Sequence, residues 1–359
     1  MNKIKTSQKL NILITGAGAP GISGTIYSLK NNFDNREIII IGTDIKKNVV
    51  GKFLCDRFFV IPPAKNVDNY LRTLIKICKE ENVNVLIPQN TMELSILSSN
   101  QNKFNKVGTK VLLASKKSID LANDKFLLMQ TCKNLGLPVG KFFKVNNLSD
   151  LITKARQLGW PDENIVVKPP VSNGMRGVRI ISESFDKKKL FYEEKPNSLF
   201  TNMDDLKNIL GESFPELIVT EHLPGDEYTV DVFRHNNKTT VIPRIRNHVR
   251  SGITFQGEVI KHDKLIEYCK MISESLNLEN CFGFQFKLDK NKVPKILECN
   301  PRVQGTMVLA TFAEANIIYA SIKKALDEKI PTFEIKWGTK IFRYWGGVGV
   351  LSDSEIIKL

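Results

Sequence analysis

Apolar runs and amphipathic segments alternate along the first third of the chain. Short apolar runs that end at glycine, proline or polar residues predict buried strands at 10–15, 37–42, 85–88 and 110–114. Apolar residues at helical spacing between these runs predict helices at 22–31, 68–81 and 91–99. Strands that alternate with helices over short connections predict a parallel sheet covered by helices. We therefore expect a first α/β domain over residues 1–115.

The pattern changes after residue 115. A helix at 125–135 is stopped by Gly136 and Pro138. The strands that follow have an antiparallel character and are predicted at 165–168, 178–182, 217–221, 228–234 and 239–246. Residues 283–289 and 293–298 form a predicted hairpin, and 264–276 and 306–327 are predicted to be mainly helical. This part of the chain is therefore expected to have an α+β fold.

Composition narrows the function classes. No apolar run reaches the roughly 18 residues that span a bilayer, and the polar first ten residues do not resemble a signal peptide. The six cysteines and four histidines have no zinc or disulfide spacing, which favours free thiols in a cytoplasmic protein. The net charge of +14 is spread along the chain, so it favours anionic small molecules over nucleic acid.

A glycine-rich turn follows the first predicted strand. Gly16, Gly18 and Gly21 fit G-x-G-x-x-G between a strand and a helix, and Asp44 ends the second strand. Three interpretations are open for this turn. It could bind NAD with Asp44 on a ribose, it could be a tight turn that needs glycine for steric reasons, or it could contact a substrate other than ATP.

The strongest chemical pattern lies on the predicted hairpin. Glu298 and Asn300 are two positions apart on one strand and should share a face, and Gln285 on the neighbouring strand can join them. Such oxygen donors suit Mg²⁺ when phosphate oxygens complete its coordination. Arg302, again two positions on, would place a guanidinium beside a transferred phosphoryl group.

The run Glu298-Cys299-Asn300-Pro301-Arg302 resembles the metal site of the ATP-grasp superfamily. With Gln285 on the preceding strand, the chain is most similar to the carbamoyl-phosphate synthetase large-subunit branch. The resemblance implies a Rossmann-like pre-ATP-grasp domain at 1–115 and a two-subdomain ATP-grasp domain at 116–335. Its nucleotide lid would be about 125–222 and its metal-site part about 223–335, followed by a tail at 336–359.

The resemblance also implies roles for the phosphate-binding residues. Lys125, at the start of a helix, resembles a cation that touches the nucleotide phosphates, and Lys168 resembles the strand lysine that holds the α and β phosphates. The segment 172–178 resembles the flexible loop that closes over them, with Asn173, Gly174, Arg176 and Gly177 as contacts. Glycines in such a loop let backbone N–H groups approach phosphate.

Further residues are assigned to the nucleoside by the same resemblance. Glu221, His222 and Leu223 resemble the hinge that reads adenine, and Glu227 resembles the acid that binds the ribose hydroxyls. We expect His222 to be structural rather than a catalytic base. Asp231 has two open interpretations, a site residue or a member of a surface ion pair.

A basic run on one predicted strand marks the substrate side. Arg244 and Arg246 share a strand face, and Arg246 and Arg250 would bracket a carboxylate or phosphate. In the wider family, cations of this region stabilise the γ-phosphate or the acyl phosphate. A solvated basic edge strand is the alternative.

The resulting hypothesis is an ADP-forming carboxylate–amine ligase. ATP and one or two Mg²⁺ ions, or Mn²⁺ in their place, would bind at Gln285, Glu298 and Asn300, with Lys168, Arg246 and Arg302 as catalytic cations. The partners would be a small carboxylate and a nucleophile, with no nucleic acid and no membrane, and a homodimer through the first domain is compatible with the resemblance. The alternatives are carboxyphosphate and carbamate chemistry, an NAD-dependent dehydrogenase, and a catalytically silent nucleotide-binding module.

Overall fold

The computed structural model describes residues 9–172, 174–193, 198–250, 252–344, 346–351 and 355–358. Contacts divide the chain into two compact units. The first unit contains Met1–Asn123, Glu227–Gln285 and Cys299–Leu359, and the second contains Asp124–Asp226 and Phe286–Glu298. No helix in the described part of the chain has both the length and the apolarity that a membrane crossing requires.

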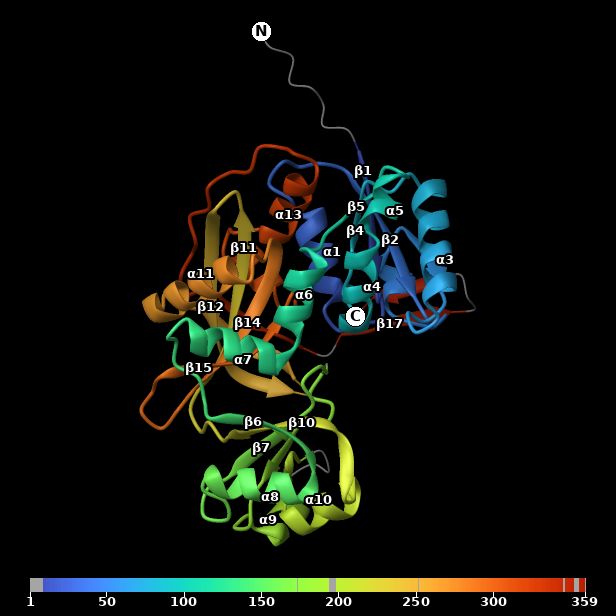
Figure 1. Ribbon diagram of the computed structural model, residues 1–359. Helices are drawn as coiled ribbons and strands as arrows, with labels where there is room; N and C mark the ends of the chain where they lie inside the picture. The colour runs from blue at the N-terminus through green and yellow to red at the C-terminus, as the bar shows by residue number, and fades with distance from the viewer. Residues whose placement is uncertain are drawn as a thin grey trace. The chain divides into compact units, whose positions relative to one another are not determined.

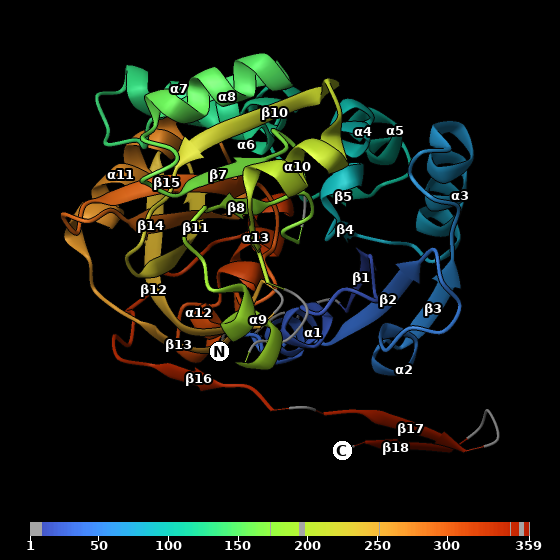
Figure 2. The same ribbon diagram turned by 90° about the horizontal axis from the view of Figure 1, so that it is seen from below.

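The first unit begins with a five-stranded parallel sheet in the order β3-β2-β1-β4-β5 (Figure 2). Ile12, Leu13 and Ile14 in the central strand are fully buried, as expected for a strand covered on both faces. The sheet confirms the predicted α/β fold, although its last strand is shorter than the apolar run at 110–114. The strands are β1 (Leu10–Thr15), β2 (Ile38–Asp44), β3 (Arg57–Val60), β4 (Val85–Ile87) and β5 (Lys110–Val111).

Helices follow the strands of this sheet, as their amphipathic spacing predicts. The longest, α3, buries Tyr70, Leu71 and Leu74 on one face. Tyr70 donates a 2.5 Å hydrogen bond to the buried carboxylate of Glu93, whose pKa is raised because burial disfavours its charge. The helical elements are α1 (Ile22–Lys30), α2 (Gly51–Leu54), α3 (Val67–Glu80), η1 (Thr91–Glu93), α4 (Leu94–Ser99), α5 (Gln101–Asn105) and α6 (Lys116–Asn123).

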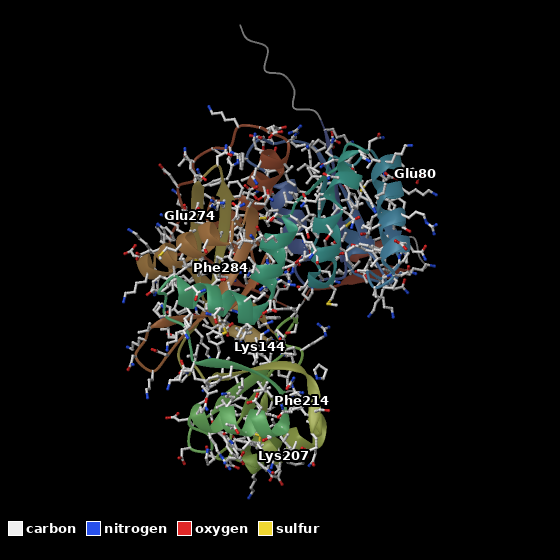
Figure 3. The ribbon with its side chains drawn as sticks, viewed as in Figure 1. Glu80, Lys144, Lys207, Phe214, Glu274 and Phe284 are labelled. Atoms are coloured by element: carbon white, nitrogen blue, oxygen red, sulfur yellow. The ribbon has the colours of Figure 1, made fainter. Side chains whose placement is uncertain are left out.

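A six-stranded sheet follows in the order β15-β14-β11-β12-β13-β16. Strands β14 and β15 carry the chain between the first and second units. Phe284 in β14 is fully buried (Figure 3). The elements are β11 (Glu227–His235), β12 (Lys238–Arg250), β13 (Ile253–Val259), β14 (Asn280–Leu288), β15 (Pro294–Asn300), β16 (Lys340–Phe342), α11 (Asp263–Ser275), α12 (Val308–Phe312) and α13 (Ile317–Ala325).

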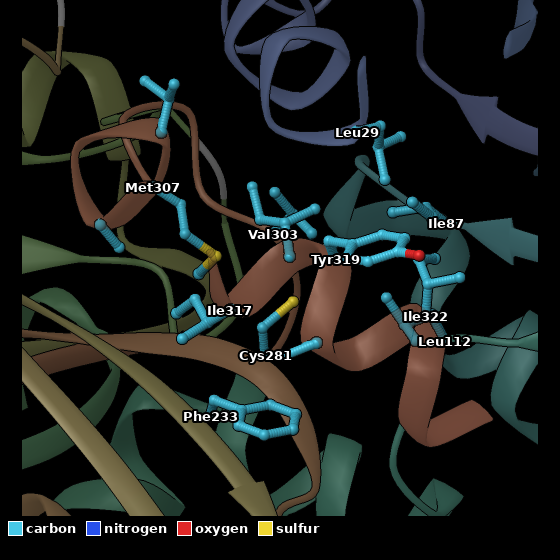
Figure 4. Close-up of a cluster of buried hydrophobic side chains, with 14 of the residues drawn as sticks. Leu29, Ile87, Leu112, Phe233, Cys281, Val303, Met307, Ile317, Tyr319 and Ile322 are labelled. Carbon is cyan, nitrogen blue, oxygen red and sulfur yellow. The ribbon is translucent and has the colours of Figure 1, made fainter. Parts of the chain in front are cut away.

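One apolar core joins the two sheets of the first unit. Leu29 of α1 and Ile87 of β4 belong to the same cluster as Tyr319 of α13 and Phe233 of β11 (Figure 4). The first six residues of α13, from Ile317 to Ile322, are buried, which explains why this part of the helix is mainly apolar. The loop after β15 contributes Val303 and Met307 to this cluster, so the position of that loop is fixed by packing.

The second unit contains a sheet in the order β6-β10-β7-β8-β9, with helices α8 and α10 packed on it (Figure 1). Leu151 of α8 and Leu206 of α10 share its core with Val167 and Val219. The elements are α7 (Lys125–Asn134), β6 (Phe142–Asn147), α8 (Leu148–Gln157), β7 (Ile165–Lys168), β8 (Arg179–Ile181), α9 (Lys187–Glu193), β9 (Phe200–Thr201), α10 (Met203–Leu210) and β10 (Ser213–Glu221).

The last strands, β17 (Val348–Leu351) and β18 (Glu355–Lys358), pair with each other as a separate two-stranded sheet. The sequence patterns did not predict this pair.

Candidate active site

The predicted hairpin is present and is built on Asp289. The Asp289 carboxylate accepts hydrogen bonds of 2.9 Å from the backbone N–H groups of Asn291 and Val293, which closes the turn between β14 and β15. Glu298 and Asn300 are two positions apart in β15 and both are half-buried. Alternation therefore places their side chains on the same face of the strand. Gln285 lies in the neighbouring strand β14 and is also half-buried.

Lys125 lies beside Glu298 in the second unit. The Asp124 carboxylate caps α7 by accepting from the backbone N–H groups of Phe126 and Leu127, which fixes the start of the helix at Lys125. The Lys125 ammonium is 3.5 Å from the Glu298 carboxylate and 3.2 Å from the Ser172 hydroxyl. The lysine is only 4% exposed, whereas the Glu298 side chain is 28% exposed.

Lys168 is the second buried cation of the same unit. It ends β7, is 6% exposed, and donates a 3.3 Å hydrogen bond to the carbonyl of Leu297. Burial, and then the charge of Lys125, lower the pKa of Lys168 to about 8, while Glu298 opposes the shift. Two buried ammonium groups beside one carboxylate give this part of the unit an excess of positive charge, which suits phosphate.

The loop after β7 contains the predicted glycines. Gly174 and Gly177 have φ angles of +59° and +75°, which favour glycine. A Cβ on Gly177 would lie 2.6 Å from Cγ of Pro169, so a side chain at 177 would displace the loop. Arg176 is exposed. Asn173 was also predicted as a contact and lies outside the described residues.

The predicted adenine hinge follows β10. Glu221 ends the strand and forms a 3.0 Å ion pair with Lys295. Leu223 is 6% exposed and packs into the core, while His222 is half-buried. Burial, followed by the charge of Lys287, lowers the pKa of His222, so the ring is neutral near pH 7.

Glu227 and Arg246 form an ion pair in the first unit. Arg246 donates to the Glu227 carboxylate, to the carbonyl of Gly252 at 2.7 Å and to the hydroxyl of Thr254 at 3.0 Å. Its side chain is 4% exposed. These contacts hold Glu227 in place, and the assignment of Arg246 as a catalytic cation stays a prediction. The Nε of Arg250 donates a 3.0 Å hydrogen bond to Nε2 of His248.

Arg302 contacts the sheet edge of the first unit. It donates to the side-chain oxygen of Asn300 at 3.1 Å, to the carbonyl of Val303 at 2.9 Å and to the Thr91 hydroxyl at 3.4 Å. Thr91 follows β4, and the sequence patterns did not identify it as a site residue. The structure thus places the Arg302 guanidinium against the Asn300 side chain, and the assigned roles of both residues stay predictions.

Asp231 is not part of a surface ion pair, which corrects one of its two predicted interpretations. It is fully buried and accepts hydrogen bonds of 2.8 and 3.3 Å from Arg244, which is 2% exposed. Strand β11 lies inside the six-stranded sheet and is covered on both faces, so its polar residues are buried as well. Arg244 is therefore not a solvated edge residue either.

The first glycine turn is packed tightly. The Asp44 carboxylate accepts a 2.8 Å hydrogen bond from the backbone N–H of Gly18. A Cβ on Gly21 would lie 2.5 Å from Cα of Gly305 in the loop after β15. These contacts support a steric requirement for glycine in this turn and give Asp44 a structural partner.

The oxygen donors of β15 fit a hard divalent ion. Among the residues that the structure describes, no group of three His, Cys, Asp or Glu side chains could hold a metal. An ion at Glu298 and Asn300 would therefore need phosphate oxygens and water to complete its coordination, which is typical of Mg²⁺ bound with a nucleotide.

Two family descriptions match the chain. Residues 12–112 match the PylC-like N-terminal domain, and residues 213–341 match the family described as ATP-grasp in the biosynthetic pathway with Ter operon. The carbamoyl phosphate synthase large chain of Clostridium acetobutylicum is 26% identical over 218 residues, which cover 57% of this chain and 18% of that protein. The chain thus spans about a fifth of the length of this curated relative.

Solved structures show the same fold. N5-carboxyaminoimidazole synthetase from Staphylococcus aureus, complexed with ADP, is 18% identical with a TM-score of 0.66 and covers 94% of this chain and 82% of its own. The biotin carboxylase domain dimer of Hydrogenobacter thermophilus 2-oxoglutarate carboxylase, with MgADP and bicarbonate, is 15% identical with a TM-score of 0.66 and coverages of 92% and 73%. L-amino acid ligase from Bacillus licheniformis is 12% identical with a TM-score of 0.62 and coverages of 89% and 75%.

Proposed function

We propose that this chain is an ADP-forming ligase, because residues 213–341 match an ATP-grasp family and residues 12–112 match a PylC-like N-terminal domain. It activates a carboxylate as an acyl phosphate and joins the acyl group to an amine or a similar nucleophile. The single observation that carries this proposal is the buried cluster of Lys125, Lys168 and Glu298, with Asn300 two positions farther along the same strand.

Most of the residues that would bind the nucleotide belong to the second unit, and Glu227 belongs to the first. Lys125 and Lys168 offer ammonium groups to its phosphates, and the loop at 174–178 offers backbone N–H groups. Glu221, His222 and Leu223 would line the adenine, and Glu227 would accept hydrogen bonds from the ribose hydroxyls. Support comes from the burial of Lys125 and Lys168, and from the positive φ angles of the loop glycines.

The chemical step transfers the γ-phosphoryl group of ATP. An oxygen of the substrate carboxylate forms a bond to the γ-phosphorus while the bond from that phosphorus to the β–γ bridging oxygen breaks, and ADP leaves. Glu298, Asn300 and Gln285 would hold Mg²⁺, and the bound ion would neutralise the negative charge of the phosphate oxygens. Lys168 and Arg302 would face the charge that develops on the transferred group. An amine then attacks the acyl carbon, loses a proton and releases phosphate.

The finer expectations belong to the same proposal. The site would accept Mn²⁺ in place of Mg²⁺, the protein would act in the cytoplasm on small molecules, and two copies would associate through the first domain. The dimer is supported by one structural neighbour that was crystallised as a dimer. The boundary at 115 is supported by the matched range 12–112, whereas the matched range 213–341 runs past the proposed boundary at 335.

A second candidate reaction is carboxyphosphate and carbamate formation from bicarbonate. The similarity to the carbamoyl phosphate synthase large chain favours it. A screen for ADP release tests both candidates at once. Mg-ATP is supplied with amino acids, sugar acids or bicarbonate, each with and without an amine. Release that depends on one carboxylate supports the ligase, and release with bicarbonate alone supports the second candidate. ATP binding with no release in any mixture would contradict both.

A further inference from the structure

Lys295 of β15 pairs with two carboxylates at once. Its ammonium is 3.0 Å from the carboxylate of Glu221, which ends β10, and 3.3 Å from that of Asp289, which closes the hairpin turn. All three residues belong to the second unit. Burial alone would lower the pKa of Lys295, but its hydrogen bonds and ion pairs with both carboxylates outweigh burial and raise the pKa. The ammonium therefore stays charged and holds the two carboxylates together.

Lys295 lies outside the metal and phosphate site described above. It is three positions from Glu298 in the same strand, and side chains at an odd spacing in a strand point to opposite faces. The predicted metal ligands Glu298 and Asn300 therefore share one face of β15, and Lys295 extends from the other. The metal and phosphate contacts thus do not explain why Lys295 is paired with Glu221.

The Glu221 carboxylate is enclosed by the chain on its other side as well. A Cβ on Gly140 would lie 3.1 Å from Oε1 of Glu221, the same oxygen that accepts a hydrogen bond from Lys295. The backbone N–H of Glu221 donates to the carbonyl of Lys141 at 3.1 Å. The carboxylate thus lies between the segment before β6 and strand β15, where it anchors the end of β10.

The chain that leaves the predicted adenine hinge has a second anchor on the same hairpin. Gly225 donates from its backbone N–H to the carbonyl of Leu288 at 3.0 Å, and the backbone N–H of Leu288 donates to the carbonyl of Asp226 at 2.9 Å. This second anchor consists of backbone hydrogen bonds, whereas the first depends on the side chains of Glu221 and Lys295. The position of the first hinge residue therefore depends on the Lys295 ammonium.

We propose that Lys295 positions the adenine hinge by fastening Glu221 to the hairpin of β14 and β15. This inference rests on the proposed ligase function and adds to it a positioning residue that controls nucleoside affinity without contacting the reacting atoms. Without the ammonium, the carboxylates of Glu221 and Asp289 would repel each other and displace the end of β10. Contacts of the hinge with the nucleoside would weaken, and the phosphate contacts of Lys125 and Lys168 would stay.

The test compares a ligand that has a nucleoside with one that has none. Lys295→Met keeps the aliphatic stem and removes the ammonium. Titration calorimetry measures the binding of Mg-ADP and of Mg-tripolyphosphate, which carries phosphates alone. We expect the Kd of Mg-ADP to rise about 10-fold in this variant and that of Mg-tripolyphosphate to change by less than about 2-fold. A general loss of structure would weaken both ligands together.

Three further variants show whether the effect belongs to the ion pair. Lys144→Met breaks a lysine–carboxylate pair with Glu216 at 2.8 Å in the same unit and should change neither Kd. Lys295→Arg keeps a cation between the two carboxylates and should bind Mg-ADP within about 3-fold of the wild type. Glu221→Leu removes the other half of the pair, so the double variant with Lys295→Met should bind Mg-ADP no more weakly than either single variant.

The outcomes separate this inference from the proposed function. Wild-type binding of both ligands, with an unchanged Kd of Mg-ADP or with equal losses for both ligands in Lys295→Met, would overturn the role of Lys295 alone. If Lys295→Met does not fold, Glu221→Leu is measured in its place, and unchanged Mg-ADP binding by that variant has the same meaning. A wild-type chain that binds neither ligand refutes the proposed function.

Discussion

The ammonium of Lys125 lies 3.5 Å from the carboxylate of Glu298, although one residue begins helix α7 and the other is near the end of strand β15. The side chain of Lys125 is buried, and the buried Lys168 lies close enough to feel the charges of both Lys125 and Glu298. The sequence suggested a metal ligand and two phosphate-binding cations as separate motifs, and the fold of the second unit brings all three together.

Removing the Lys168 charge should abolish nucleotide use without harming the fold. In Lys168→Met the aliphatic stem is kept and a buried ammonium is lost. The pKa of about 8 means that burial, together with the charge of Lys125, disfavours the Lys168 charge by about 3 kcal/mol, so we expect equal or higher stability. ADP release should fall at least about 100-fold. Lys188→Met, at an exposed lysine of α9, should change neither quantity.

The pH dependence of nucleotide binding should also report Lys168. Above pH 8 the free protein loses this proton, and binding of phosphate should restore it. Mg-ATP affinity is therefore expected to fall above pH 8, with proton uptake on binding. Titration calorimetry at pH 8.5 in two buffers of different ionisation enthalpy measures that uptake. A binding enthalpy that does not change with the buffer would contradict the assignment.

The same shift has a consequence for stability with a defined sign. Between about pH 8 and the ordinary lysine value of 10.5, the unfolded chain holds a proton that the native chain has lost. The contribution of Lys168 to the free energy of unfolding therefore rises with pH across this window. Urea unfolding at pH 8 and pH 10 should show this rise relative to Lys168→Met.

Glu298→Gln should separate metal use from folding. The amide keeps the shape of the side chain but loses the charge that holds a divalent ion and pairs with Lys125. We expect ADP release to fall at least about 100-fold and to require much higher Mg²⁺. Glu216→Gln removes a surface carboxylate paired with Lys144 at 2.8 Å in the same unit and serves as the matched control. Equal losses in the two variants would speak against a metal site.

Gly177 tests the role of the loop after β7. Gly177→Ala combines a φ of +75° with a Cβ 2.6 Å from Pro169, whereas Gly136→Ala has a φ of +72° and no neighbour within 4 Å. Both substitutions should cost about 1 kcal/mol of stability through the backbone. Only Gly177→Ala should raise the KM for ATP. Identical kinetics in the two variants would remove the loop from the nucleotide site.

Local patterns were sufficient for much of the fold. The apolar strands, the helix that begins at Lys125 and the hairpin at Asp289 each have nearby signals, such as a capping aspartate or a turn residue. The alternation of β15 placed Glu298 and Asn300 on one face because strand geometry alone determines that relationship.

Pairing between distant strands could not be predicted in the same way. Arg246 meets Glu227, and Arg244 meets Asp231, because of the register between β11 and β12. No spacing in the sequence encodes that register. The approach of Gly21 and of Arg343 to Gly305 likewise depends on packing in the first unit. The buried contact between Arg244 and Asp231 excluded the interpretation of Arg244 as a residue of a solvated basic edge strand.

The central claim is that a substrate carboxylate attacks the γ-phosphorus of ATP. The most direct test uses a carboxylate that supports ADP release, labelled with oxygen-18 in both carboxyl oxygens, together with Mg-ATP and an amine. Mass spectrometry of the released inorganic phosphate then reports which oxygen was phosphorylated. Our account predicts one labelled oxygen in each phosphate molecule. Phosphate that carries oxygen from water alone would show that no acyl phosphate forms and would contradict the account.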